Sequence, residues 1–146
     1  MNKKTVLLVL SLVCLMLSAP NCAASTTHVE SIVADSLVHD NTVGNDELTF
    51  KVYVPDDYNQ GRSQGYPVLY LLHGSHGKVT DWDRFLELLD ELISKGVIEP
   101  VLAVVPVTGN SYWVDSDEFG AYESAVMFDL IPHIDRTYNT LPTREG

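Results

Sequence analysis

The chain has 146 residues and a net charge of −11, from 20 acidic residues against 9 basic ones. This length allows one domain at most, and a hydrophobic fraction of 45% can support a buried core. The acidic balance excludes nucleic acids and anionic membranes as expected partners, because no basic patch is present to bind phosphate groups. We attribute the acidity to solubility rather than to cation binding.

The start of the chain has the pattern of an export signal. Lys3-Lys4 precedes an apolar stretch at residues 6–17, and the small residues Cys22-Ala23-Ala24 offer a cleavage site. We therefore predict a signal peptide at residues 1–24 and a mature domain at residues 25–146. The protein is expected to be secreted or periplasmic, without stable membrane insertion after cleavage.

Cysteine usage agrees with this division of the chain. Both cysteines, Cys14 and Cys22, lie in the predicted signal, so the mature domain is expected to have no disulfide. Lipid attachment through Cys22 is an alternative that Asn21 disfavours, because asparagine is a poor residue before a lipidated cysteine. The mature domain keeps 7 basic residues against 20 acidic ones, a net charge of −13.

Two strands are predicted at the beginning of the mature domain. Residues 28–37 are strand-like, and residues 41–46 form a turn that contains Gly44. Apolar and polar residues then alternate over residues 48–54, which is typical of a strand with one covered face. We expect these two strands to form an antiparallel pair at the edge of a sheet.

The most informative stretch is residues 67–72, where six apolar or aromatic residues follow one another. The lack of alternation predicts a strand that helices cover on both faces. This strand leads into a glycine-bounded loop at residues 73–77. Open α/β sheets place ligands at the carboxyl ends of their strands, so this loop is the candidate functional site.

A helix and another strand follow the loop. Apolar residues at helical spacing predict a helix over residues 82–93, with Thr80 as the N-cap and Gly96 just after the helix end. Residues 101–107 predict a second buried strand.

A second helix is predicted over residues 122–138. Pro132 lies inside it and is expected to kink it, leaving the carbonyl of Phe128 without its usual donor. Strand, helix, strand and helix after an edge pair predict an α/β fold whose sheet becomes parallel after its first strands.

The loop has two chemical interpretations. Gly74 and Gly77 allow backbone N–H groups to approach a ligand closely, as in the oxyanion hole of acyl-transfer enzymes, or they merely permit a tight turn. His73 is expected to hold the loop in shape by a hydrogen bond from its ring. A zinc site with His76 is disfavoured, since no third ligand stands at a recognisable spacing.

Aromatic and acidic residues near the loop also leave alternatives open. Trp82, Tyr112 and Trp113 could line a pocket or pack against the core. The acidic residues at 115, 117 and 118 are expected to be solvated. No nucleotide-binding or CxxC motif is present, so neither a cofactor nor a metal ion is expected.

Several segments, taken together, resemble the esterase D-like "putative esterase" family of α/β-hydrolases. The resemblance covers roughly residues 45–146, in order and at sensible separations, and rests on these segments: Tyr66-Pro67-Val68-Leu69-Tyr70-Leu71-Leu72-His73-Gly74, Asp81-Trp82, Val104-Val105-Pro106 with the loop after it, Tyr122-Glu123, and Asp129-Leu130-Ile131-Pro132-His133-Ile134-Asp135. That family includes feruloyl and acetyl xylan esterases, S-formylglutathione hydrolases and mycolyltransferases. The resemblance implies the N-terminal half of an α/β-hydrolase fold, with a mostly parallel sheet, an antiparallel edge and helices on both faces.

The resemblance also implies a site. The loop of His73, Gly74 and Ser75 would supply part of an oxyanion hole, with the backbone N–H of Ser75 as the donor. The reaction would use a Ser-His-Asp triad, whose serine takes up the acyl group. The substrate would be an ester that is either a small molecule or linked to a polysaccharide.

The triad itself has no counterpart in this chain. Family members carry the G-x-S-x-G nucleophile elbow after a further strand, whereas the only such pattern here is Gly61-Arg62-Ser63-Gln64-Gly65, which precedes the 67–72 strand. We therefore expect a fold truncated before the elbow strand, and a chain that is inactive alone. A non-catalytic module that binds a carbohydrate or acyl group, or an inactive esterase fragment, are the alternatives.

Overall fold

A computed structural model describes residues 24–38 and 46–141. The predicted signal peptide, apart from Ala24, and nearly all of the turn predicted at residues 41–46 lie outside the described residues. No helix in the described part of the chain is long and apolar enough to cross a membrane.

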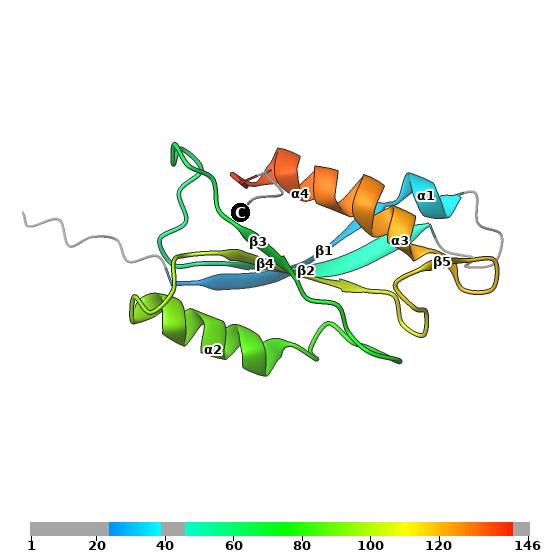
Figure 1. Cartoon of the computed structure of the whole chain (residues 1–146), viewed down its shortest axis with the longest axis horizontal. Helices are drawn as coiled ribbons and strands as arrows, with labels where there is room; N and C mark the ends of the chain where they lie inside the picture. The colour runs from blue at the N-terminus through cyan, green and yellow to red at the C-terminus, as the bar shows by residue number, and fades with distance from the viewer. Residues whose placement is uncertain (1–23, 39–45, 142–146) are drawn as a thin grey trace, which may run out of the picture.

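Among the described residues, four strands form one mixed sheet in the order β1-β2-β4-β3 (Figure 1). The first two strands, β1 (Thr26–Val33) and β2 (Glu47–Val54), pair antiparallel, as predicted for the sheet edge. β2 is also antiparallel to β4 (Leu102–Val107), while β3 (Val68–Tyr70) runs parallel to β4. The predicted α/β sheet with an antiparallel edge is confirmed.

Helices lie on both faces of this sheet, as predicted. Figure 1 shows α2 (Asp83–Ser94) on one face and α1 (Asp35–Val38) on the other, together with the long helix near the C-terminus. That helix consists of α3 (Tyr122–Ser124), the π-helical segment η1 (Ala125–Leu130) and α4 (Ile131–Thr137). A small hairpin of β5 (Asp115–Ser116) and β6 (Gly120–Ala121) precedes it.

Two strand predictions need correction. The strand predicted over residues 28–37 ends at Val33, because the chain turns into α1 there, with Leu37 buried in the core. β2 is buried on both faces instead of one, because helices cover both sides of the sheet at this strand. Phe50 contributes to the core under α1, η1 and α4, and Tyr53 contributes to the core under α2.

The helix predicted over residues 82–93 is confirmed as α2, with one error at its start. The N-cap is Trp82, which makes no side-chain capping bond, whereas Thr80 contributes only its carbonyl, at 3.1 Å from the Asp83 nitrogen. Gly96 does lie just after the helix, at φ 65°, and its N–H donates to the Ile93 carbonyl. The left-handed φ at this position favours glycine, which is why Gly96 indicated the end of the helix in the sequence.

The second predicted helix is present but differs around Pro132. The irregularity precedes the proline: η1 is π-helical and ends at Leu130, and Pro132 then lies in the first turn of α4. The N–H of Ile131 donates to the Val126 carbonyl, five residues earlier instead of four, so the helix continues through the wider turn into α4. Pro132 therefore lies inside a continuous helix, as predicted, but the turn before it is π-helical and not α-helical.

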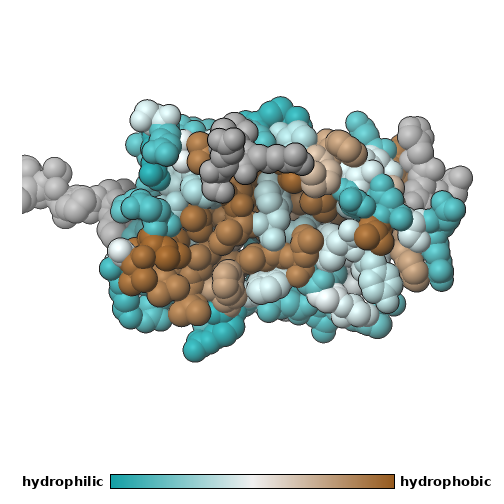
Figure 2. All heavy atoms as spheres, viewed as in Figure 1, coloured by the Kyte–Doolittle hydropathy of each residue, from teal (hydrophilic) through white to brown (hydrophobic). Residues whose placement is uncertain are grey.

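β3 is shorter and more open than the predicted strand at residues 67–72. It forms one edge of the sheet of described residues, with Leu69 37% exposed and Leu72 41% exposed. A single parallel bridge from Tyr66 to Thr140 lies beside its start. Figure 2 shows hydrophobic residues gathered over this edge and the end of α2, where Val97 and Ile98 are also exposed.

We predict that this edge makes the 146-residue chain self-associate, because an apolar strand edge offers free N–H and C=O groups to another chain. Replacing Leu69 by Lys is expected to reduce the concentration-dependent association seen by analytical ultracentrifugation. Leu88→Lys makes the same change at an exposed leucine of α2. Equal effects of the two variants would contradict a role for the strand edge.

Candidate functional site

The loop that follows β3 is organised around the ring of His73, which is buried. The backbone N–H of Thr108, just after β4, donates to Nε2 of His73 at 3.1 Å. Because Nε2 must accept this bond, we assign the ring proton to Nδ1, which lies 2.6 Å from the Gly74 carbonyl oxygen and donates to it. The predicted loop-shaping bond of His73 is therefore present, and both ring nitrogens are occupied.

Trp113 holds the same loop from the other side. Its indole Nε1–H donates to the His73 carbonyl at 2.8 Å, and the two rings pack with their centroids 4.9 Å apart. Consecutive carbonyls, those of His73 and Gly74, thus each accept a hydrogen bond from a side chain.

These bonds determine how the backbone at Ser75 is presented. The Gly74 carbonyl and the Ser75 N–H belong to one planar peptide unit, and the described residues contain no cis peptide bond, so the two groups point in opposite directions. Since the carbonyl points to the buried His73 ring, the Ser75 N–H points away from it. Ser75 is exposed, and its N–H has no acceptor within the described residues.

The side chains of the loop tip take no part in that arrangement. The hydroxyl of Ser75 lies 2.8 Å from Nδ1 of His76, which adopts a left-handed φ of 61°. Among the described residues, no group of three His, Cys, Asp or Glu side chains is placed to hold a metal ion.

The two glycines of the loop have different structural reasons. A Cβ on Gly77 would lie 1.9 Å from Cγ of His73, so the ring can occupy its place only if residue 77 has no side chain. A Cβ on Gly74 would meet nothing within 4 Å, and Gly74 does not have a positive φ. The space in front of Gly74 is therefore open.

A hollow of about 200 Å³ lies next to the loop. Its walls come from the segment after β3, the segment after β4 and the start of the long helix. Most of the lining side chains are apolar: Leu72, Trp113, Tyr122, Glu123, Val126 and Met127. Asp115 fixes this helix start, accepting bonds from the N–H and hydroxyl of Ser124 at 2.9 Å and 2.6 Å. These bonds lower the pKa of the Asp115 carboxyl below its ordinary value.

The three aromatic residues singled out in the sequence separate in the structure. Trp113 lines this hollow, whereas Trp82 packs against the core under α2 and lines a separate hollow beside that helix. Tyr112 is exposed and packs edge-on against Phe119. The acidic residues at 115, 117 and 118 are exposed, as expected, although Asp115 also caps the helix. Sequence reasoning did not connect Val126 and Met127 with the loop, because no motif relates the long helix to it.

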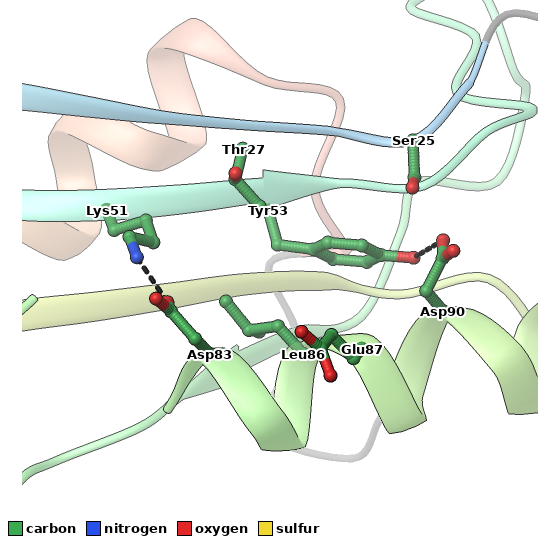
Figure 3. Close-up of a pocket in the computed structure, with 8 residues that line it drawn as sticks. All are labelled: Ser25, Thr27, Lys51, Tyr53, Asp83, Leu86, Glu87 and Asp90. Carbon is green, nitrogen blue, oxygen red and sulfur yellow. Dashed lines mark hydrogen bonds and ion pairs between the residues drawn. The ribbon is translucent and has the colours of Figure 1, made fainter. Parts of the chain in front are cut away.

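A second hollow, of about 350 Å³, lies between the sheet and α2 (Figure 3). Its charged groups already have partners, because Lys51 pairs with Asp83 and the Tyr53 hydroxyl donates to Asp90 at 2.9 Å. Burial raises the pKa of the Tyr53 phenol, and its bond to Asp90 adds to the shift. We therefore regard the residues around this hollow as structural contacts between β2 and α2.

Comparisons with known proteins place the chain among esterases. Residues 41–145 match the protein family described as "Putative esterase". The chain is 32% identical over 102 residues to an endo-1,4-beta-xylanase/feruloyl esterase of Xylanibacter ruminicola, and the match covers 63% of this chain and 14% of that protein.

Solved structures share the fold. A ferulic acid esterase matches with a TM-score of 0.71 at 23% identity, over 86% of this chain and 47% of that one. An S-formylglutathione hydrolase from Agrobacterium tumefaciens matches with a TM-score of 0.55 at 18% identity, over 85% and 48%. The predicted α/β-hydrolase fold is confirmed, and the chain spans about half the length of these structures.

The two glycines lead to opposite expectations for stability. Gly77→Ala should lower the free energy of unfolding by about 1–3 kcal/mol or more, because the added methyl group displaces the His73 ring. Gly74→Ala should change it by no more than about 0.5 kcal/mol. Urea unfolding of both variants measures the difference, and equal losses would contradict the described packing of His73 on Gly77.

The ion pair in the second hollow should respond unequally to loss of either partner. The Lys51 side chain is 10% exposed and that of Asp83 is 48% exposed. Asp83→Ala should cost about 2 kcal/mol, because it strips a buried ammonium of a charged hydrogen bond and removes an acid from the first turn of α2. Lys51→Met should cost less than about 1 kcal/mol, because Asp83 can be hydrated.

Thermal and urea unfolding test this asymmetry. Glu91→Ala is the matched control, since its partner Lys95 is exposed on the same helix and such pairs contribute little. A larger loss for Lys51→Met than for Asp83→Ala would contradict the burial of the lysine.

Proposed function

The chain belongs to the "Putative esterase" family, and on that basis we propose that it forms the oxyanion-binding part of an exported carboxylic-ester hydrolase. The observation that carries the proposal is the peptide unit between Gly74 and Ser75. The His73 ring binds its carbonyl, so the N–H of Ser75 is presented on the exposed side of the loop.

This donor suits the chemistry of acyl transfer. When a nucleophile attacks an ester carbonyl, the oxygen becomes negatively charged, and a fixed N–H stabilises that charge more than it stabilises the neutral ester. We assign this role to the backbone of Ser75, with Gly74 leaving room and His73 setting the orientation. The Ser-His-Asp triad is proposed to lie beyond this chain.

The hollow beside the loop suits the acyl group. Its lining is mostly apolar, and Leu72 and Trp113 connect it directly to His73. An aromatic acid would fill such a space with favourable contacts to the indole. We propose an ester of an aromatic acid, and polysaccharide-linked esters fit the relative that is named as both a xylanase and a feruloyl esterase.

Export is part of the same proposal. It is supported by the signal-like pattern at residues 1–24, which includes a positive start and an apolar stretch. Intact mass of the mature protein in the culture medium or periplasm, starting near Ser25, is the measurement that tests it.

Substitutions at Ser75 test the oxyanion role, in the natural protein that contains this chain, expressed from its full gene. Ser75→Pro removes the N–H, whereas Ser75→Ala keeps it and removes only the hydroxyl. With methyl ferulate as the substrate, kcat of the proline variant is expected to be about 10²–10³-fold below that of the alanine variant. The two melting temperatures serve as the control for folding.

Other outcomes separate the alternatives. If both variants have the same kcat, the Ser75 N–H is not a donor. If Ser75→Ala alone abolishes activity, the hydroxyl acts directly. Binding of ferulate without hydrolysis by the wild type would favour a non-catalytic module that uses the same apolar hollow.

A further inference from the structure

Trp113 belongs to both parts of the proposed site. Its indole N–H donates to the His73 carbonyl at 2.8 Å, and its side chain is a wall of the apolar hollow. We infer that Trp113 is a positioning residue that holds the oxyanion loop in its active geometry and couples that geometry to the acyl group in the hollow. This inference rests on the proposed function and deepens it.

The reason for such a residue lies in Gly74. Glycine has more conformational freedom than any other residue, so the orientation of the peptide units on its two sides must be imposed from outside. The unit after Gly74 is fixed by Nδ1 of His73 at 2.6 Å, and the unit before it is fixed by Trp113. Without the indole bond, no other hydrogen bond within the described residues fixes the peptide unit before Gly74, and only the His73 ring still holds the unit that carries the Ser75 N–H.

Trp113 is itself well anchored. The segment before it is tied to the end of β4, where the Ser111 N–H donates to the Thr108 carbonyl at 3.3 Å. The segment after it is tied to the long helix by the bonds from Ser124 to Asp115. The backbone is thus held on both sides of Trp113. A ligand in the hollow that pushes on the indole therefore displaces the side chain against a fixed backbone, and the indole passes that displacement on to the His73 carbonyl.

The chain also supplies a matched control, because Trp113 and Trp82 are its two tryptophans. The indole nitrogen of Trp82 is buried and has no hydrogen-bond partner within the described residues. Trp82→Phe therefore removes an unbonded N–H, whereas Trp113→Phe removes a bonded one and keeps an aromatic wall for the hollow.

The experiment compares the two phenylalanine variants with the wild type by ¹H–¹⁵N NMR of the full chain. Trp113→Phe should shift the backbone amide signals of Gly74 and Ser75, because the His73 carbonyl next to them loses its hydrogen bond. Trp82→Phe should leave both signals in place. If the Gly74 and Ser75 signals respond equally to both substitutions, or to neither, the inference is wrong.

Titration with ferulate examines the coupling. In the wild type, ferulate should shift the Trp113 indole signal and the Gly74 and Ser75 amides with a single dissociation constant. In Trp113→Phe, binding should weaken only a few-fold, because a ring remains, while the response of the two amides is lost. If those amides respond to ferulate as they do in the wild type, Trp113 does not couple the hollow to the loop.

Two further results keep the proposal separate from the proposed function. If Trp113→Phe does not fold, the wild-type indole signals decide, with Trp82→Phe assigning them: a Trp113 signal that exchanges as a free indole would overturn the inference. If the protein expressed from the full gene neither binds ferulate nor hydrolyses methyl ferulate, the esterase proposal fails, while the amide response to Trp113→Phe still supports positioning of the loop.

Discussion

The hydrogen bond from the Thr108 N–H to Nε2 of His73 joins the ends of two neighbouring strands and decides the state of the ring between them. With Nε2 as acceptor, the proton resides on Nδ1 and is available to the Gly74 carbonyl. That second bond turns the peptide unit so that the N–H of Ser75 is presented outward. One buried ring thereby sets the direction of the backbone donor on which the proposed chemistry depends.

The arrangement of strands explains why these two loops meet. β3 and β4 are parallel, so their carboxyl ends lie at the same edge of the sheet, and the residues that follow them, His73 and Thr108, come within hydrogen-bond distance. The antiparallel partners on the other side of β4 have a different role. They extend the sheet, and helices bury β2 on both faces, with Lys51 paired with Asp83 under α2 (Figure 3).

Local signals in the sequence were sufficient for much of the fold. The spacing of apolar residues located α2 and Gly96 its end, and uninterrupted apolar runs located β3 and β4. The errors came where distant contacts override local preference. Ala34 and Leu37 belong to a core built with residues 85 or more positions away, such as Tyr122, so the chain leaves β1 early. The spacing of apolar residues gave no indication of the π-helical segment before Pro132.

The site shows the same division. His73 could be predicted as a loop-shaping residue, but its partner Thr108 is 35 positions away and no motif connects them. The sequence left two roles possible for Trp113, lining a pocket or packing. In the structure it has both, because its ring packs against the His73 ring and its side chain lines the hollow. A hydrogen bond to a backbone carbonyl could not be read from an isolated tryptophan, since any carbonyl can accept it.

Gly77 and Gly74 illustrate how structure separates folding from function within one loop. The His73 ring lies where a side chain at 77 would be, so packing alone explains that glycine. Nothing comparable explains Gly74. Its φ is not positive, so other residues could adopt it, and a Cβ added there would contact none of the described residues. Glycine raises the entropic cost of ordering a loop, so a glycine without a conformational reason points to something that must come close to the backbone. An ester carbonyl approaching the N–H of Ser75 would require that space.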